Sequence, residues 1–105
     1  RPTFGRQQKF GSAKVINNMQ LIEFIAKQAG LADITAQIKA VEYVRARAVA
    51  IKLLTERGLG RHETARLLKR EPKTIRHALL SWPTMWANDI SAVRLYHAGQ
   101  AALAD

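Results

Sequence analysis

Four side chains able to contact a base edge or a phosphate lie close together in the sequence: Lys73, Thr74, Arg76 and His77. Cations and hydroxyls near the start of a helix are the groups that a DNA-reading helix presents to the major groove. Arg76 is the best candidate for a bidentate contact with guanine, and Lys73 for guanine or phosphate. Thr74 suits a phosphate or a thymine methyl group. His77 fits two roles equally well, as a donor to a base or as a residue of the core.

The surrounding stretch, residues 59–80, reads LGRHETARLLKREPKTIRHALL and has the pattern of a helix-turn-helix. We expect a helix over 61–69 with Gly60 as its N-cap, a turn at Arg70-Glu71, and a second helix from Pro72 to about Ser81. The expected inward residues are Ala65, Leu68, Ile75 and Leu79. Such turns usually carry a glycine, which is missing here. The alternative is a helical hairpin with a charged outer face.

Further cations around this motif suit phosphate contacts, which fix the register of a protein on DNA without reading its sequence. Lys and Arg outnumber Glu by ten to three between residues 45 and 80, within a chain of net charge +9 and pI about 10.7. Charge focused on one element favours a polyanion as partner, and nucleic acid is the commonest one. The expected phosphate contacts are Arg61, Arg66, Lys69 and Arg70, with Arg45 and Arg47 on the supporting helix.

Residues 22–78 resemble the C-terminal DNA-binding domain of the bacterial replication initiator DnaA. The pieces that carry the resemblance are IEFIAKQAGLADIT (22–35), RAVAIKLLTE (47–56) and REPKTIRHA (70–78). The resemblance implies a helix-turn-helix that binds double-stranded DNA, and it supports Thr74 as a reader. Glu71, Pro72 and Lys73 replace the base-reading Asp-His-Thr of that family, and its Arg-rich loop corresponds to QIKAVE (37–42), with one cation. We therefore expect a divergent relative with a different DNA site.

The other segments also have helical spacing, with no strand pattern. We expect a helix from Ser12, its N-cap, to Gly30, and one long helix from Asp33, a second N-cap, to about Arg57; the alternative to the long helix is two helices with a bend near 40–45. A last helix is expected over 84–104, after Pro83. Its expected apolar stripe is Trp86, Ile90, Val93 and His97. The fold class is thus all-α, a compact bundle of about five helices. Residues 12–105 form one domain with the helix-turn-helix at 60–81, and residues 1–11 form a basic arm.

Catalytic and metal-binding patterns are missing from the sequence. There is no cysteine, and His62-Glu63 is not a zinc motif because Arg66 stands where the second histidine belongs. We therefore expect no enzyme, no cofactor and no metal. The absence of an apolar run of roughly 18–20 residues argues against a membrane span. These features fit a cytoplasmic, nucleoid-associated bacterial protein.

The expected function is sequence-specific binding of double-stranded DNA, in the regulation of transcription or of replication initiation. The alternative is a small basic adaptor that binds a protein or RNA. Trp82, Met85, Trp86 and Tyr96 enrich the C-terminal part in interface-type residues. They either complete the core or form a seam for a homodimer or protein partner along the C-terminal helix, where Ala98, Ala101 and Ala102 would admit another helix.

Overall fold

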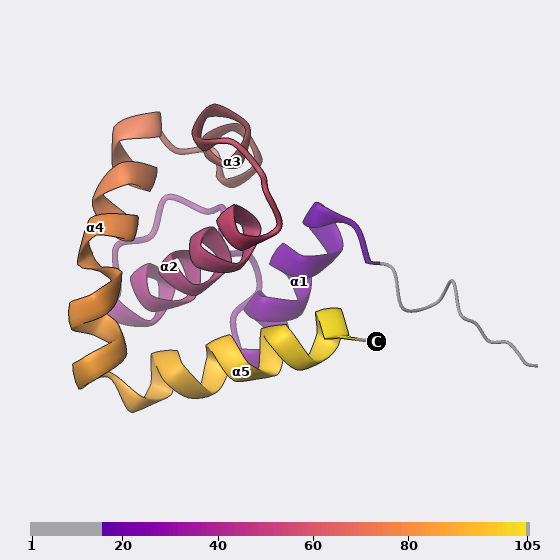
Figure 1. The fold of residues 1–105 in the computed structure, drawn as a ribbon, viewed down its shortest axis with the longest axis vertical. Coiled ribbons are helices and arrows are strands. Elements are labelled where there is room, and N and C mark those ends of the chain that lie inside the picture. Colours follow the sequence, from indigo (N-terminus) through magenta and orange to yellow (C-terminus); the bar gives the residue numbers. More distant parts are fainter. Residues whose placement is uncertain (1–15, 105) are drawn as a thin grey trace, which may run out of the picture.

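In the computed structural model, which describes residues 16–104, a central helix is surrounded by four others (Figure 1). In chain order the helices of this part are α1 (Asn18–Gln28), α2 (Val41–Glu56), α3 (Arg61–Leu68), α4 (Pro72–Asn88) and α5 (Ile90–Ala104). The central helix is α2, which contacts each of the other four. The prediction of an all-α bundle of about five helices is confirmed. The predicted arm over 1–11 and the predicted cap Ser12 lie outside the described residues.

Helix α1 begins later than predicted. Ile16 and Asn17 are not helical, and Asn17 is the N-cap. Its side chain accepts a hydrogen bond from the N–H of Gln20, whose side chain accepts in return from the N–H of Asn17, both at 2.8 Å. This reciprocal capping box fixes the start of the helix. The predicted stop at Gly30 is confirmed: α1 ends at Gln28 and Gly30 adopts φ +75°, a conformation that costs glycine little.

The predicted long helix from Asp33 is wrong, because α2 begins only at Val41. Asp33 caps a local turn instead: its Oδ1 accepts from the N–H of Thr35 at 2.9 Å and from its hydroxyl at 2.7 Å. These bonds hold the pKa of Asp33 below its usual value. Ile34 in this turn is fully buried. Residues 33–40 therefore form a folded loop before α2, here called the α2 loop.

The α3–α4 pair is joined by residues 69–71 only, and its two helices cross closely. Ala65 of α3 is 2% exposed, and Leu68 of α3 and Ile75 of α4 are fully buried. Both helices also contact α2. The predicted inward residues are thus confirmed, with Leu79 half-buried. A small side chain at Ala65 lets the helices approach each other.

Helix α4 does not end near Ser81 as predicted but continues to Asn88 with Pro83 inside it. A proline inside a helix removes one backbone hydrogen bond and costs about 3 kcal/mol. Here the same turn carries Trp82, which is 7% exposed and packs against Tyr96, with ring centroids 5.5 Å apart and ring planes tilted by 46°. Burying a large aromatic side chain offsets a cost of this size. The packing of Trp82 therefore outweighs the tendency of Pro83 to end the helix.

Helix α5 begins at Ile90 and not at Thr84, and its buried face differs from the predicted stripe. Ile90 is 63% exposed, whereas Ala92, Leu95, Tyr96 and Gly99 are buried. A Cβ atom at Gly99 would overlap the side chain of Leu53, so this glycine lets α5 approach α2. Trp82 completes the core, while Trp86 lies at its edge, 39% exposed.

The crossing of α3 and α4 yields a stability prediction. Replacing Ala65 by Leu overpacks the contact and should lower the free energy of unfolding by about 1–3 kcal/mol. Urea denaturation followed by circular dichroism measures this change. Ala87→Leu is the matched control, because Ala87 lies exposed on α4. An unchanged denaturation midpoint for Ala65→Leu would contradict the close crossing.

A second prediction concerns the buried phenol of Tyr96, which donates to Glu56 Oε1 at 2.5 Å. Burial, helped by this hydrogen bond and by the negative charge of Glu56, raises the pKa of Tyr96 to about 12. Unfolding therefore releases its proton between about pH 10 and pH 12, and stability falls as pH rises through this range. In urea titrations from about pH 9 to about pH 11.5, the wild type should lose more stability than Tyr96→Phe. If the free energies of unfolding of the two proteins change in parallel with pH, the phenol does not contribute to the pH dependence of stability.

Candidate nucleic-acid interface

The predicted base-reading residues are all exposed on the first two turns of α4. Lys73, Thr74, Arg76 and His77 have exposed side chains, while Ile75 between them is buried. Pro72 occupies the first turn, as predicted, where its missing N–H costs nothing. The helical period accounts for this pattern, since residues 75, 78, 79 and 82 turn toward the core and the others turn away.

The exposed residues divide between the two flanks of α4. Arg76 lines a hollow of about 460 Å³ together with Arg61 and His62 from the start of α3. Thr74 and His77 line a different hollow, on the side that faces α2. Leu80, one turn beyond Arg76, is 66% exposed. The predicted readers are therefore brought onto one helix, but among them only Arg76 shares a hollow with Arg61 of α3.

The turn before α4 is built around Lys69, which adopts the left-handed conformation with φ 57° and ψ 45°. This is the place where the sequence lacks the usual glycine. The turn still closes, because the N–H of Arg70 donates to the carbonyl of Ala65 at 2.9 Å. A non-glycine residue pays roughly 1–2 kcal/mol in this conformation. The side chain of Lys69 is exposed and lines a hollow with Asp33 and residues of α1.

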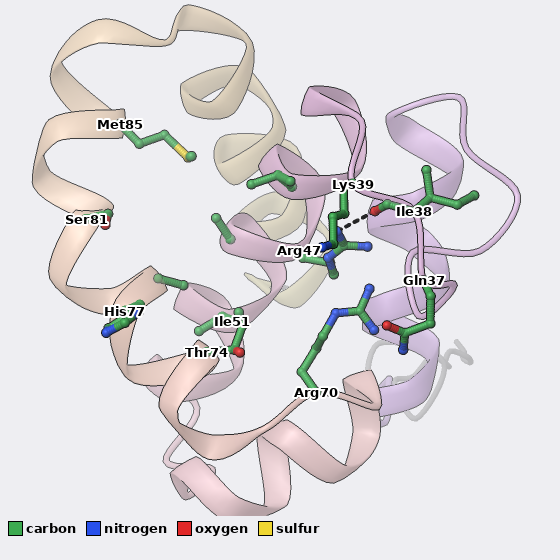
Figure 2. Close-up of a pocket in the computed structure, with 13 residues that line it drawn as sticks. Gln37, Ile38, Lys39, Arg47, Ile51, Arg70, Thr74, His77, Ser81 and Met85 are labelled. Atoms are coloured by element: carbon green, nitrogen blue, oxygen red, sulfur yellow. Dashed lines mark hydrogen bonds between the residues drawn. The ribbon is translucent and has the colours of Figure 1, made fainter.

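Arg47, predicted as a phosphate contact, is buried and engaged within the fold. It is 8% exposed, and its guanidinium donates to three carbonyl oxygens of the α2 loop; Figure 2 shows the bond to Ile38. These are Ile34 and Ala36 from Nη1, at 3.1 and 3.2 Å, and Ile38 from Nη2, at 2.6 Å. Burial and the neighbouring Arg70 lower the pKa of Arg47. In a longer helix these carbonyls would accept from backbone N–H groups. Here they accept from the side chain of Arg47 instead.

Arg70, also predicted as a phosphate contact, is likewise engaged within the fold. Its Nη2 donates to the carbonyl of Ala36 at 2.6 Å, and its Nη1 to that of Thr35 at 3.2 Å. The same Nη1 lies 3.1 Å from the carbonyl of Lys69 and 3.2 Å from that of Leu68. Ala36 thus accepts from both guanidiniums. Arg47 and Arg70, which we call the arginine clamp, hold the α2 loop against the α3–α4 turn.

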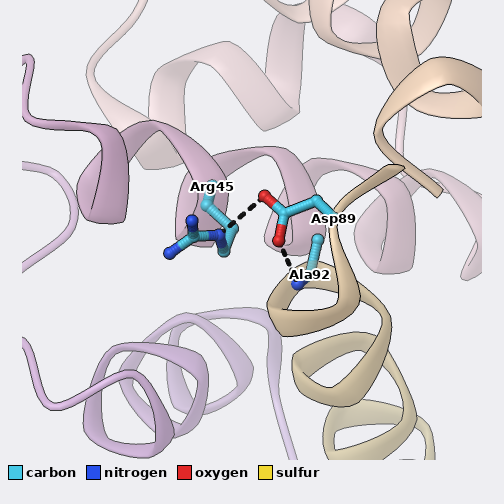
Figure 3. Close-up of polar contacts among 3 residues, drawn as sticks. All are labelled: Arg45, Asp89 and Ala92. Carbon is cyan, nitrogen blue, oxygen red and sulfur yellow. Dashed lines mark hydrogen bonds and ion pairs between the residues drawn. The ribbon is translucent and has the colours of Figure 1, made fainter. Parts of the chain in front are cut away.

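Arg45 is likewise paired within the chain. Its Nε donates to Asp89 Oδ2 at 2.8 Å, and Asp89 Oδ1 accepts from the N–H of Ala92 at 3.1 Å (Figure 3). The hydrogen bond from Arg45 is the main reason that the pKa of Asp89 lies below its usual value. Asp89 therefore caps α5 and ties the α4–α5 junction to α2. Of the predicted phosphate contacts, Arg61, Arg66 and Lys69 remain exposed.

Two features of this surface are not predicted from the sequence. Gln37, Ile38 and Lys39 of the α2 loop line the hollow beside Thr74 and His77, and Gln37 Nε2 donates to the carbonyl of Lys69 at 3.3 Å. The sequence predicts a helix over this loop, and no local signal indicates its position beside α4. Within residues 16–104 no group of three or more His, Asp or Glu side chains is placed to hold a metal ion.

Comparison of the chain with models of protein families, with curated proteins and with solved structures finds no match. None of the helices in residues 16–104 is long and apolar enough to cross a membrane.

The arginine clamp predicts unequal roles for two arginines of α2. Arg47→Met keeps the aliphatic stem but removes the side-chain donor from the buried carbonyl of Ile34 and the part-buried carbonyl of Ile38. It should lower the free energy of unfolding by about 2–3 kcal/mol. Arg45→Met breaks a partly exposed pair and should cost about 1 kcal/mol or less. Urea denaturation of both variants tests the order. Equal losses would mean that the clamp contributes no more than the surface pair.

Proposed function

We propose that this protein binds double-stranded DNA through α3 and α4, used as a helix-turn-helix with α4 in the major groove. The observation that carries the proposal is the exposed, cation-bearing start of α4 on a helix fixed by a close crossing with α3. Lys73 and Arg76 are exposed there, and Ala65 and Ile75 are buried beneath them. A recognition helix needs both properties, because it must be held rigidly and still reach base edges.

The division of the exposed groups suggests a role for each. Arg76 is the proposed guanine reader, since a guanidinium can donate two bonds to O6 and N7. Thr74 and His77, on the other flank, are proposed to contact a neighbouring base or the backbone. Arg61, Arg66, Lys69 and Lys73 are the proposed phosphate contacts. Arg45, Arg47 and Arg70 are left out of this set because their guanidiniums are engaged within the chain.

The smaller set of cations limits the expected salt dependence. Each phosphate neutralised on B-form DNA contributes about 0.9 to the slope of log affinity against log salt. Three or four such contacts predict a slope of roughly −3, whereas seven would give roughly −6. The biological role that we favour is regulation of replication initiation or transcription; the resemblance to the DnaA domain tilts this choice toward replication.

Selection from random duplex DNA tests the proposal, with Arg76→Ala as the informative variant. The wild type should enrich a defined motif, and Arg76→Ala should bind it more weakly by about 1–3 kcal/mol while losing preference at one or two positions. Lys27→Ala is the matched control, since it removes one exposed cation from α1. Its affinity should stay close to that of the wild type.

Two outcomes would contradict these roles. If Arg76→Ala weakens all duplexes equally, Arg76 is a phosphate contact and not a reader. If the wild type enriches no motif and its binding disappears at moderate salt, sequence-specific DNA binding is rejected. The alternative of an adaptor for a protein or RNA partner would then explain the basic surface better.

A further inference from the structure

A trough of about 450 Å³ lies between α2, the α2 loop and the flank of α4 that carries Thr74 (Figure 2). On α2 its wall is formed by Val44, Ala48 and Ile51, spaced as i, i+4 and i+7. The wall on α4 runs from Thr74 to Met85, which is about 16 Å at 1.5 Å per residue. The trough therefore offers two helical walls and a length of about three helical turns.

The apolar side chains of the two walls, together with Ile38 of the α2 loop, form the floor of the trough, and the fold leaves this floor incompletely covered. Val44 and Ile38 are 44% and 41% exposed, and Ala78 and Met85 are half-buried. Small side chains at Ala48 and Ala78 leave room between the walls. Apolar anchors at a helical spacing are what an amphipathic helix uses to bind a groove. The shape and lining thus suit a helix from another protein.

Charge restricts which helix can bind. Among the residues that line the trough, Lys39, Arg47 and Arg70 are cationic and none is a carboxylate. Arg47 and Arg70 donate to carbonyl oxygens, which satisfy their hydrogen bonds but bring no negative charge. Within residues 16–104 no carboxylate pairs with either guanidinium. A positive charge thus persists beside an apolar floor, where electrostatic interactions are stronger than in water.

We propose that the trough binds an acidic amphipathic helix of a partner protein, with apolar side chains on the floor and carboxylates toward Lys39 and the arginine clamp. A nucleic-acid backbone would meet the charge but leave the floor exposed. A neutral apolar helix would fill the floor but leave the cations without a counter-charge. An acidic amphipathic helix meets both requirements.

Binding of such a helix bears on DNA recognition, and this consequence rests on the proposed function. Thr74 and His77 line the trough and are also proposed contacts with DNA. The acidic helix and the duplex would therefore compete for one flank of α4. A partner of this kind would act as an inhibitor of DNA binding.

Display of random peptides of about 16 residues, long enough for three to four helical turns, provides the test. The library is selected on the whole chain without DNA, so the result does not depend on DNA binding. Enriched peptides should be acidic, with apolar residues at helical spacing. Their affinity for Val44→Glu should fall by at least about tenfold, because this carboxylate repels them from the trough.

Val41→Glu is the matched control: it makes the same change one turn earlier on α2, at a side chain 64% exposed and outside the trough. It should bind the peptides as the wild type does, and circular dichroism should show both variants folded. The proposal is overturned if no peptide is enriched, if the enriched peptides are basic, or if they bind Val44→Glu as well as Val41→Glu. It is also overturned if no peptide binds the trough while Val44→Glu, but not Val41→Glu, weakens the binding of DNA. That result would assign the trough to the duplex.

Discussion

The hydrogen bonds from two arginines to the carbonyls of one loop are the constraint on which the rest of this surface depends. Arg47 reaches the α2 loop from the central helix, and Arg70 reaches it from the α3–α4 turn, so that Ala36 accepts from both. A loop without regular structure would otherwise leave these buried and part-buried carbonyls unpaired. The clamp therefore fixes three elements together: the loop, the turn and the start of α4. The position of the exposed cations follows from it.

The same contacts divide the basic residues into two groups with different uses. Arg45, Arg47 and Arg70 hold elements together, and the cations of α3 and early α4 remain at the surface. Net charge alone would have counted both groups as binding surface. The two flanks of α4 also differ: one lies beside Arg61 of α3, and the other lies beside an apolar trough. The two proposed partners would thus contact one helix.

The sequence predicted most reliably what depends on local signals. Gly60, Pro72 and the spacing of Ala65, Leu68 and Ile75 placed α3 and the start of α4, and the helical period gave the exposed residues between them. It failed where a distant contact decides. Asp33 can cap a helix or a turn, and Arg47, fourteen residues on in the sequence, stabilises the turn. Pro83 would end an isolated helix, but burial of Trp82 carries α4 past it. The partner of a cation is also a tertiary property, so the roles of the clamp arginines had no local signature.

The left-handed Lys69 has a consequence for how this surface can be transplanted. Helix α3 has only eight residues, which is too few to be stable alone. In the turn after it, Lys69 adopts the left-handed conformation, which is unfavourable for a residue other than glycine. Nothing local therefore makes residues 60–81 fold as an autonomous unit. A peptide or graft of that segment would lose the geometry, whereas exchange of α4's exposed side chains within the intact domain would keep it. For protein engineering, the smallest portable module is thus the whole bundle with its loop.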